Sequence, residues 1–174
     1  QDICPHFCKA FDKKSVAIHP NFRKKEQDPF EHHDKPIYID VLFMEYITDS
    51  IPLFDLIKDT EIPSIHIINS IKQVMLAISI AQKEKKFVHY DLHSMNILMN
   101  TQHQDDVHLY ILEDGNAMCI PTFGYVPIII DYGFSFSTDL YGHPSYLSLS
   151  YTDAGYMSPG YDSIADSKVF LVSL

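Results

Sequence analysis

The segment from Ser64 to Lys86 carries the most regular pattern in the sequence, and it constrains the fold more than any other feature. Its apolar residues recur at spacings of three and four, which is the pattern of one face of an α-helix. Its last residues are lysines, which suit the negative end of a helix dipole. The apolar face is formed by Ile68, Ile71, Val74, Met75, Ile78 and Ala81. The sequence therefore predicts a core helix whose end positions the segment that follows it.

That following segment, FVHYDLHSMNILM, is a polar loop between apolar residues. It places His89 two residues before Asp91, and Asn96 five residues after Asp91. A side chain of this kind, a carboxylate in a loop at the end of a helix, can accept the proton of an attacking hydroxyl group. The loop alone is a weak signal, and its meaning depends on what accompanies it.

A second acidic position, Asp131, ends the apolar run VPIII, and Gly133 two residues later allows the backbone to turn sharply. A carboxylate that closes an apolar strand is costly to desolvate unless it has a partner or a metal. The side-chain oxygens of Asn96 and Asp131 are hard ligands of the kind that bind Mg²⁺ together with phosphate. With Asp91 as a free carboxylate, this is the set of groups that phosphoryl transfer uses.

The remaining elements follow from alternation and turn residues. The alternating segment 37–44 is apolar on both faces, so we expect a well-buried strand. Residues 45–57 read as a connector and a short helix, and residues 133–163 as a long loop rich in Ser, Tyr, Gly and Pro. Further short strands are expected at residues 7–11, 97–99, 107–112 and 126–130, with a turn at Asp114-Gly115-Asn116 and a polar loop from residue 12 to 36.

Composition excludes several classes of protein. The 174 residues correspond to about one domain, and the formal net charge of −10 argues against nucleic-acid binding. Three irregularly spaced cysteines do not form a disulfide framework and are typical of a reducing compartment. CPHFC lacks the second ligand pair of a zinc site. We find no run of the ~20 apolar residues that a membrane span needs.

These motifs together resemble the protein kinase superfamily. HYDLHSMN is similar to the catalytic loop H-R-D-L-x-x-x-N, and IIIDYGFS is similar to the D-F-G segment. VLFMEYI resembles the strand and hinge that lie under the adenine ring of ATP in kinases, and CPHFCKAF resembles the N-lobe strand before it. Asp166 resembles the buried aspartate at the start of the next large helix. The segments IIIDYGFSFS and GYMSPGYDSIADSKVFL also resemble segments of the divergent kinases of large nucleocytoplasmic DNA viruses.

The resemblance implies an α+β, protein kinase-like fold, in which residues 1–44 end the β-rich N-lobe, residues 45–50 form the hinge, and residues 51–174 form the mainly helical C-lobe. It implies ATP and Mg²⁺ as cofactors. In this reading Asp91 is the catalytic base, His89 braces the loop and His93 helps to place the γ-phosphate. Asn96 and Asp131 hold the metal, and the adenine site is formed by Met44, Glu45, Tyr46 and Ile47.

Several residues differ from the protein kinase pattern, and these differences leave other functions open. Tyr90 replaces the arginine of H-R-D, so activation by an arginine that grips a phosphorylated loop is not expected. His93 replaces a lysine and is closer to haspin-like and aminoglycoside-phosphotransferase-like loops. There is no clear A-P-E and no G-x-G, and SVAIH only mimics the lysine-bearing V-A-I-K strand. Besides a Ser/Thr protein kinase, a small-molecule kinase and a pseudokinase scaffold therefore remain open.

Both ends read as cut, and the expected phosphate loop and strand lysine would lie upstream of Gln1. We therefore expect the intact parent to be the enzyme, and this chain alone to bind ATP weakly and to transfer negligible phosphate. The expected partners are ATP and a protein substrate, with no nucleic acid and no membrane. The expected location is the cytoplasm, or the host cytoplasm or virion if the protein is viral.

Overall fold

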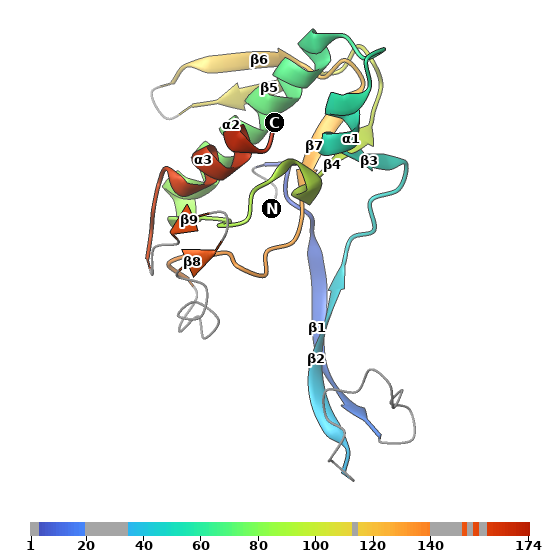
Figure 1. The fold of residues 1–174 in the computed structure, drawn as a ribbon, viewed down its shortest axis with the longest axis vertical. Helices are drawn as coiled ribbons and strands as arrows, with labels where there is room; N and C mark the ends of the chain where they lie inside the picture. The colour runs from blue at the N-terminus through green and yellow to red at the C-terminus, as the bar shows by residue number, and fades with distance from the viewer. Residues whose placement is uncertain (1–3, 20–34, 113–114, 140–150, 153–154, 157–159) are drawn as a thin grey trace. The chain divides into compact units, whose positions relative to one another are not determined.

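The computed structural model describes residues 4–19, 35–112, 115–139, 151–152, 155–156 and 160–174. The chain forms two compact units, one of which is Cys8–Tyr46. The other combines Gln1–Phe7 with Ile47–Leu174. The boundary between them falls after Tyr46, inside the segment 45–50 that the sequence analysis assigned to a hinge. Figure 1 labels the elements of both units.

The smaller unit is an antiparallel pair of strands, β1 (Ala10–Ile18) and β2 (Ile37–Met44), with an irregularity in the register between Ala10 and Asp12. The strand at the predicted position 37–44 is confirmed, but its predicted burial is wrong, because its side chains are half-buried or exposed. In the described residues β2 pairs only with β1, and a two-stranded ribbon has no second layer to cover it. The first strand starts later and runs further than predicted, through residues assigned to a loop.

The larger unit is built on α2 (Ser64–Lys85), as predicted, preceded by the short helix α1 (Leu53–Lys58). Against them lies a three-stranded antiparallel sheet in the order β3 (Ser50–Pro52), β4 (Ile97–Thr101), β7 (Tyr125–Ile129). The core between these elements is apolar. Its buried members are Leu53, Leu56, Val74, Ala77, Ile78, Leu92, Ile97, Met99, Ile129 and Phe170.

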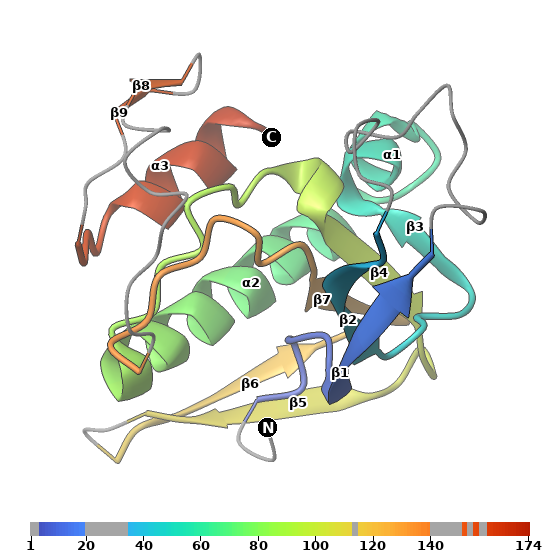
Figure 2. The ribbon, with the colours of Figure 1, turned by 90° about the horizontal axis from the view of Figure 1, so that it is seen from below.

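A hairpin of β5 (Val107–Ile111) and β6 (Ala117–Pro121) lies on one side of α2, and α3 (Ala165–Val172) lies on the other side (Figure 2). The strand β5 was predicted. The strand β6 was not, because its sequence AMCIP contains no polar residues and so shows no alternation of polar and apolar side chains. Between the two strands, Gly115 N–H donates to Leu112 O at 3.0 Å, and the φ of Gly115 is +80°; Asp114 of the predicted turn lies outside the described residues.

Within the predicted loop 133–163, the structure describes two short paired strands, β8 (Tyr151–Thr152) and β9 (Gly155–Tyr156). The other described residues of this stretch, up to 139, form turns and one bridge, in which Phe136 pairs with Val88. Most of the remaining residues that we assigned to this loop lie outside the described part of the chain.

The helix α2 is long and apolar enough to pass a length and composition criterion for a membrane-crossing helix, which the sequence analysis did not expect. Core helices of soluble proteins pass the same criterion. The buried residues of α2 include Asn69 and Gln73, whose side-chain amides donate to Pro121 O at 3.2 Å and to Tyr125 O at 3.3 Å. These polar contacts with β6 and β7 fit a helix that packs inside the protein.

His6 fastens the N-terminal segment of the larger unit to its strands. Its imidazole is fully buried, Nδ1–H donates to Pro127 O at 2.8 Å, and Nε2 accepts from the Tyr110 hydroxyl at 2.5 Å. The backbone of His6 also accepts from Ile129 N–H at 2.7 Å. Burial is the main cause that lowers the pKa of His6, to about 4. The ring is therefore neutral in the folded protein at neutral pH.

This burial predicts that protonation of His6 opposes folding between pH 6.5 and pH 4. The unfolded chain binds a proton at His6 near pH 6.5, whereas the folded chain does so only near pH 4, so stability falls as the pH falls through this window. This difference in the pKa of His6 between the unfolded and folded states corresponds to about 3 kcal/mol. His108 beside it, whose pKa burial also lowers, contributes in the same direction, while burial raises the pKa values of Tyr110 and Cys4 and keeps both neutral throughout.

The measurement is urea unfolding at several pH values for the wild type and for His6→Gln. We expect the variant to be less stable than the wild type at pH 7, and this difference in stability to shrink as the pH falls from 6.5 to 4; comparing the two proteins isolates His6 from the other titrating groups, including Asp166, whose contribution has the opposite sign. His103→Gln is the matched control, since the side chain of His103 is 75% exposed, and it should keep the wild-type slope. An unchanged slope in His6→Gln would assign the acid sensitivity to other groups.

Candidate functional site

The loop after α2 brings three of the predicted residues together. Asn96 Nδ2 donates to the backbone oxygen of Asp91 at 3.0 Å and to its carboxylate Oδ2 at 3.1 Å. The same amide nitrogen lies 3.2 Å from His93 Nε2, which fits Nε2 as the acceptor because an amide nitrogen only donates. His93 Nε2 lies 3.6 Å from Asp91 Oδ2, too far for a hydrogen bond. The side chain of Asp91 is oriented by Asn96 and remains 27% exposed.

Local structure explains this arrangement. Residues Ser94–Asn96 form one turn of 3₁₀ helix, in which Asn96 N–H donates to His93 O at 2.9 Å. The turn folds the asparagine side chain back over Asp91. Asn96 is 9% exposed, and Ile97 directly after it enters the buried strand β4. The core therefore fixes the end of the loop.

His89 connects this loop to the end of β7. Its Nε2–H donates to Ile130 O at 2.9 Å, which leaves Nδ1 as the acceptor for Asp91 N–H at 3.3 Å. The ring is fully buried, and burial is the main cause that lowers its pKa. Through these two contacts, the neutral His89 ring links Ile130 to the backbone of Asp91.

The backbone at Tyr90 has φ +65°, a conformation that bulky residues rarely adopt. Its N–H donates to Asp166 Oδ1 at 2.9 Å, and His89 N–H donates to Asp166 Oδ2 at 2.8 Å. The Tyr90 hydroxyl donates to Gly160 O. Asp166 is fully buried. The position where kinases have an arginine therefore holds a tyrosine that ties the loop to the chain ahead of α3.

Asp131 is exposed, so the sequence argument that its burial requires a partner is wrong. The strand β7 ends at Ile129, before Asp131, and the backbone of Asp131 then takes φ +62°. This left-handed conformation is tolerated by aspartate. Asp131 Oδ1 accepts from Gly133 N–H at 3.3 Å, an arrangement that stabilises the turn.

Asn96 and Asp131 are brought close by strand pairing. Ile97 pairs with Ile129 in the sheet, and Ile130 N–H donates to Asn96 O at 3.0 Å. No group of three His, Cys, Asp or Glu that would hold a metal by itself occurs in the described residues. Mg²⁺ commonly takes one or two protein oxygens and keeps several waters or phosphate oxygens. The Asn96 amide oxygen and the Asp131 carboxylate fit that demand.

The predicted adenine-site residues divide between the two units. Met44, Glu45 and Tyr46 belong to the smaller unit, and Ile47 begins the main part of the larger one. Glu45 N–H donates to Lys9 O at 2.8 Å, and the Cys8 thiol donates to Glu45 O at 3.6 Å. For the N–H groups of Tyr46 and Ile47, the described residues provide no hydrogen-bond acceptor.

Sequence reasoning missed residues that hold the site from a distance. Ser94 N–H donates to Ser173 Oγ, and Ser94 Oγ donates to Ser173 O, both at 2.9 Å. Ser135 Oγ donates to His89 O at 3.4 Å. Serine is common in loops, and no local pattern marks a pair that is 79 residues apart. The three cysteines are free thiols, as expected from their irregular spacing.

No family model matches the chain. It is 40% identical over 159 residues to uncharacterized protein 098R of Invertebrate iridescent virus 6, covering 79% of this chain and 26% of that protein. It is 32% identical over 177 residues to uncharacterized protein 038R of Invertebrate iridescent virus 3, covering 98% and 32%. The chain thus spans about a quarter to a third of the length of these relatives.

A further relative in Invertebrate iridescent virus 3, named probable kinase 098L, is 34% identical over 102 residues, which covers 55% of this chain and 18% of that protein. These similarities to viral proteins support the viral origin that two segments of the sequence indicated. The chain is similar to proteins of invertebrate iridescent viruses, and one of these relatives is named a kinase.

Proposed function

We propose that this chain contains the catalytic loop and metal-binding segment of an ATP- and Mg²⁺-dependent kinase with a protein kinase-like fold, which phosphorylates Ser or Thr hydroxyls of proteins. The observation that carries the proposal is the contact of Asn96 Nδ2 with Asp91 Oδ2 at 3.1 Å, beside Asp131 at the end of the paired strand. The similarity to a protein named probable kinase 098L supports phosphotransfer in general.

In the proposed reaction the substrate hydroxyl oxygen forms a bond to the γ-phosphorus, and the bond from that phosphorus to the bridging oxygen of ADP breaks. Asp91 accepts the hydroxyl proton, and its carboxylate is accessible and oriented for that task. Asn96 and Asp131 would hold Mg²⁺, which when bound neutralises charge on the phosphate oxygens. His89, with its two contacts, keeps Asp91 in register with the end of β7.

A small-molecule kinase is the second candidate, and the position of His93 favours it. In this structure His93 Nε2 contacts Asn96 Nδ2 at 3.2 Å, so the histidine belongs to the same cluster as the proposed base. The resemblance links a histidine at this place to aminoglycoside-phosphotransferase-like loops. The two candidates share Asp91, Asn96 and Asp131 and differ in the acceptor molecule.

The test is transfer of labelled γ-phosphate from ATP by the protein expressed from its complete coding sequence. We expect Mg²⁺-dependent labelling of serine or threonine in a basic protein substrate, no labelling of an aminoglycoside panel, and loss of labelling with a chelator. Labelling of aminoglycosides alone would establish the second candidate instead. ATP binding without transfer to any acceptor would identify a binding scaffold and overturn the enzymatic proposal.

A further inference from the structure

The hairpin of β5 and β6 has two unlike faces. Residues that pair directly across an antiparallel ladder share a face, so one face contains the pair Tyr110 and Met118 and the pair His108 and Ile120. Tyr110 and Ile120 are buried against the body of the larger unit. On the opposite face every side chain is exposed and none is charged. These residues are Val107, Leu109, Ile111, Ala117, Cys119 and Pro121.

The outer edge of β5 also presents unpaired backbone groups. Leu112 N–H donates to Asn116 O at 2.8 Å, and Thr122 N–H donates to Asp106 O at 2.9 Å. Hydrogen bonding in an antiparallel pair alternates along the strand, so the backbone groups of 107, 109 and 111 point away from β6. Within the described residues, β5 has β6 as its single strand neighbour, and no acceptor or donor is found for these groups. An unpaired edge is a template for a further strand.

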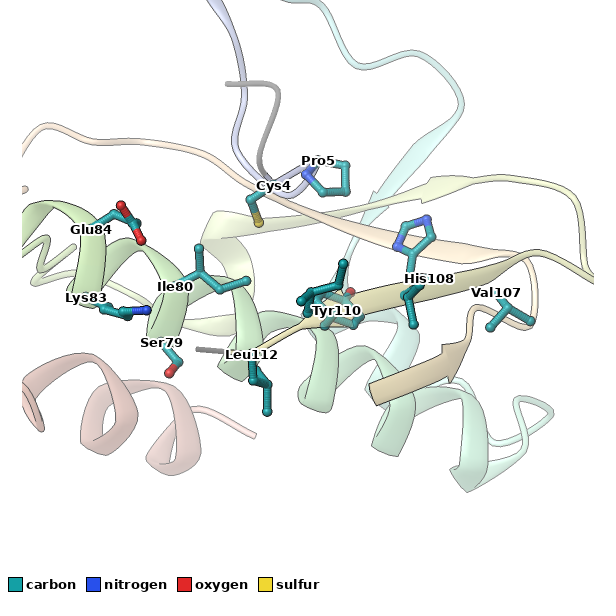
Figure 3. A pocket seen from close by; sticks show the side chains of 12 residues that line it. Cys4, Pro5, Ser79, Ile80, Lys83, Glu84, Val107, His108, Tyr110 and Leu112 are labelled. Atoms are coloured by element: carbon teal, nitrogen blue, oxygen red, sulfur yellow. The ribbon is translucent and has the colours of Figure 1, made fainter. Parts of the chain in front are cut away.

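This edge lines a groove of about 900 Å³ (Figure 3). One wall is the whole of β5, the other is formed by Ile80, Lys83 and Glu84 of α2, and Cys4 and Pro5 adjoin both walls. The volume lies at the upper end of the range of about 300–1,000 Å³ for ligand sites. Residues 107–112 span about 20 Å at about 3.3 Å per residue. The groove therefore has the length of an extended strand of about six residues.

The charges around the groove favour a basic occupant. Asp105 and Asp106 precede β5 and are exposed, with 91% of the Asp105 side chain accessible. On the α2 wall the charge of Glu84 is offset by the neighbouring Lys83, so the acidic end of the groove is the one beside Asp105 and Asp106; the chain as a whole has a formal net charge of −10. An extended peptide with lysine or arginine at one end would place its charge beside Asp105 and Asp106. Its apolar residues at alternate positions would lie beside Val107, Leu109 and Ile111 on the same face of the sheet.

We propose that the groove between β5 and α2 binds an extended peptide, with alternating apolar residues and a basic end, as a third strand of the β5–β6 sheet. The backbone groups of 107, 109 and 111 would pair with the peptide, and the apolar face would continue across it. This site is built from residues other than those of the candidate catalytic site. The proposal is therefore independent of the proposed phosphoryl transfer.

The test uses the protein expressed from its complete coding sequence and a fluorescent peptide. The peptide alternates valine and threonine over six residues and carries two lysines, at the N-terminus in one version and at the C-terminus in another. Two controls keep its composition. One scrambles the order so that the alternation is lost, and the other carries N-methyl groups on alternate amides, which removes the donors of one edge. We expect binding, measured by anisotropy, that both controls weaken about tenfold or more.

Two proline variants locate the site on the protein. Leu109→Pro removes an N–H that points into the groove, without removing a hydrogen bond between β5 and β6. Cys119→Pro is the matched control, since Cys119 pairs with Leu109 and its N–H points to the other edge of the hairpin. We expect Leu109→Pro to weaken peptide binding about tenfold and Cys119→Pro to leave it within about twofold.

Several results would overturn the proposal. One is no binding by either peptide, and another is equal binding of the N-methylated or scrambled peptides. Equal effects of the two proline variants would place the site elsewhere. Self-association that Leu109→Pro abolishes, with no peptide binding, would identify a second copy of the chain as the occupant instead. If Leu109→Pro does not fold, the comparison of the N-methylated peptide with its parent still decides the question.

Discussion

Replacing Asp91 by asparagine is expected to lower the rate of phosphoryl transfer by about 10²–10⁴-fold, the range typical for loss of a general base. The substitution removes the proton acceptor and little else. Asn96 Nδ2 donates to Asp91 Oδ2 at 3.1 Å, and the oxygen of an asparagine at 91 can accept the same hydrogen bond. The fold and the affinity for ATP should therefore be retained, and the loss should appear in kcat.

The measurement is steady-state labelling of a protein substrate by the complete protein, together with ATP binding at equilibrium. Asp55→Asn is the matched control, because it makes the same chemical change at an exposed aspartate outside both the candidate site and the β5 groove. It should turn over like the wild type. Full turnover by Asp91→Asn would refute the assignment of the base, and equal losses in both variants would indicate a general effect of charge.

Replacing Asp166 by alanine is expected to lower the free energy of unfolding by about 2–6 kcal/mol at pH 7. Asp166 is fully buried and accepts the N–H groups of His89 and Tyr90 at 2.8 and 2.9 Å. Alanine leaves both donors buried and unsatisfied, at about 1–3 kcal/mol each. Urea unfolding at equilibrium measures the change. If the proposed function is correct, the loss should also reduce phosphoryl transfer, since both donors belong to the loop that holds Asp91.

Asp55→Ala is the matched control, because Asp55 also lies in the first turn of a helix but is exposed. Its effect should stay within about 1 kcal/mol. A loss in Asp166→Ala no greater than that in Asp55→Ala would show that water or a rearranged loop satisfies the two donors. The comparison thus separates the buried hydrogen bonds from a general contribution of helix charge.

The same residue predicts a pH dependence opposite to that of His6. Burial is the main cause that raises the pKa of Asp166, to about 6. The folded state therefore favours the neutral acid, and this contribution to stability is complete below the ordinary carboxyl pKa near 4 and is lost as the pH rises through 6. The difference corresponds to about 3 kcal/mol. Asp166→Asn should remove this slope and keep the opposite slope of His6.

The sequence was sufficient for elements whose pattern is local. The periodicity of residues 64–86 predicted α2 to within one residue of its end, because a helix repeats the same spacing for several turns. The alternation of residues 37–44 predicted the strand β2 for the same reason. It did not predict its exposure, since burial depends on whether another layer covers the strand. The strand β6 was not predicted, because its residues do not alternate between polar and apolar.

For the candidate site, the sequence placed Asp91, His93 and Asn96 within one loop, and the structure shows the contacts among their side chains. Their proximity follows from sequence spacing because the loop is six residues long. The exposed position of Asp131 was not predictable in this way. It depends on the left-handed turn after Ile129, which an apolar run before an aspartate does not indicate.

Local patterns in the sequence were enough to predict α2, β2, β5 and the residue types of the candidate site. The distant groups that hold the site follow from the packing of the chain: Asp166 under the loop, Tyr90 against Gly160, and Ser173 beside Ser94. The packing also decided that the outer edge of β5 stays open within the described residues. The physical reason is that local conformation follows from neighbouring residues, whereas a buried hydrogen bond or an open edge depends on how the whole chain packs.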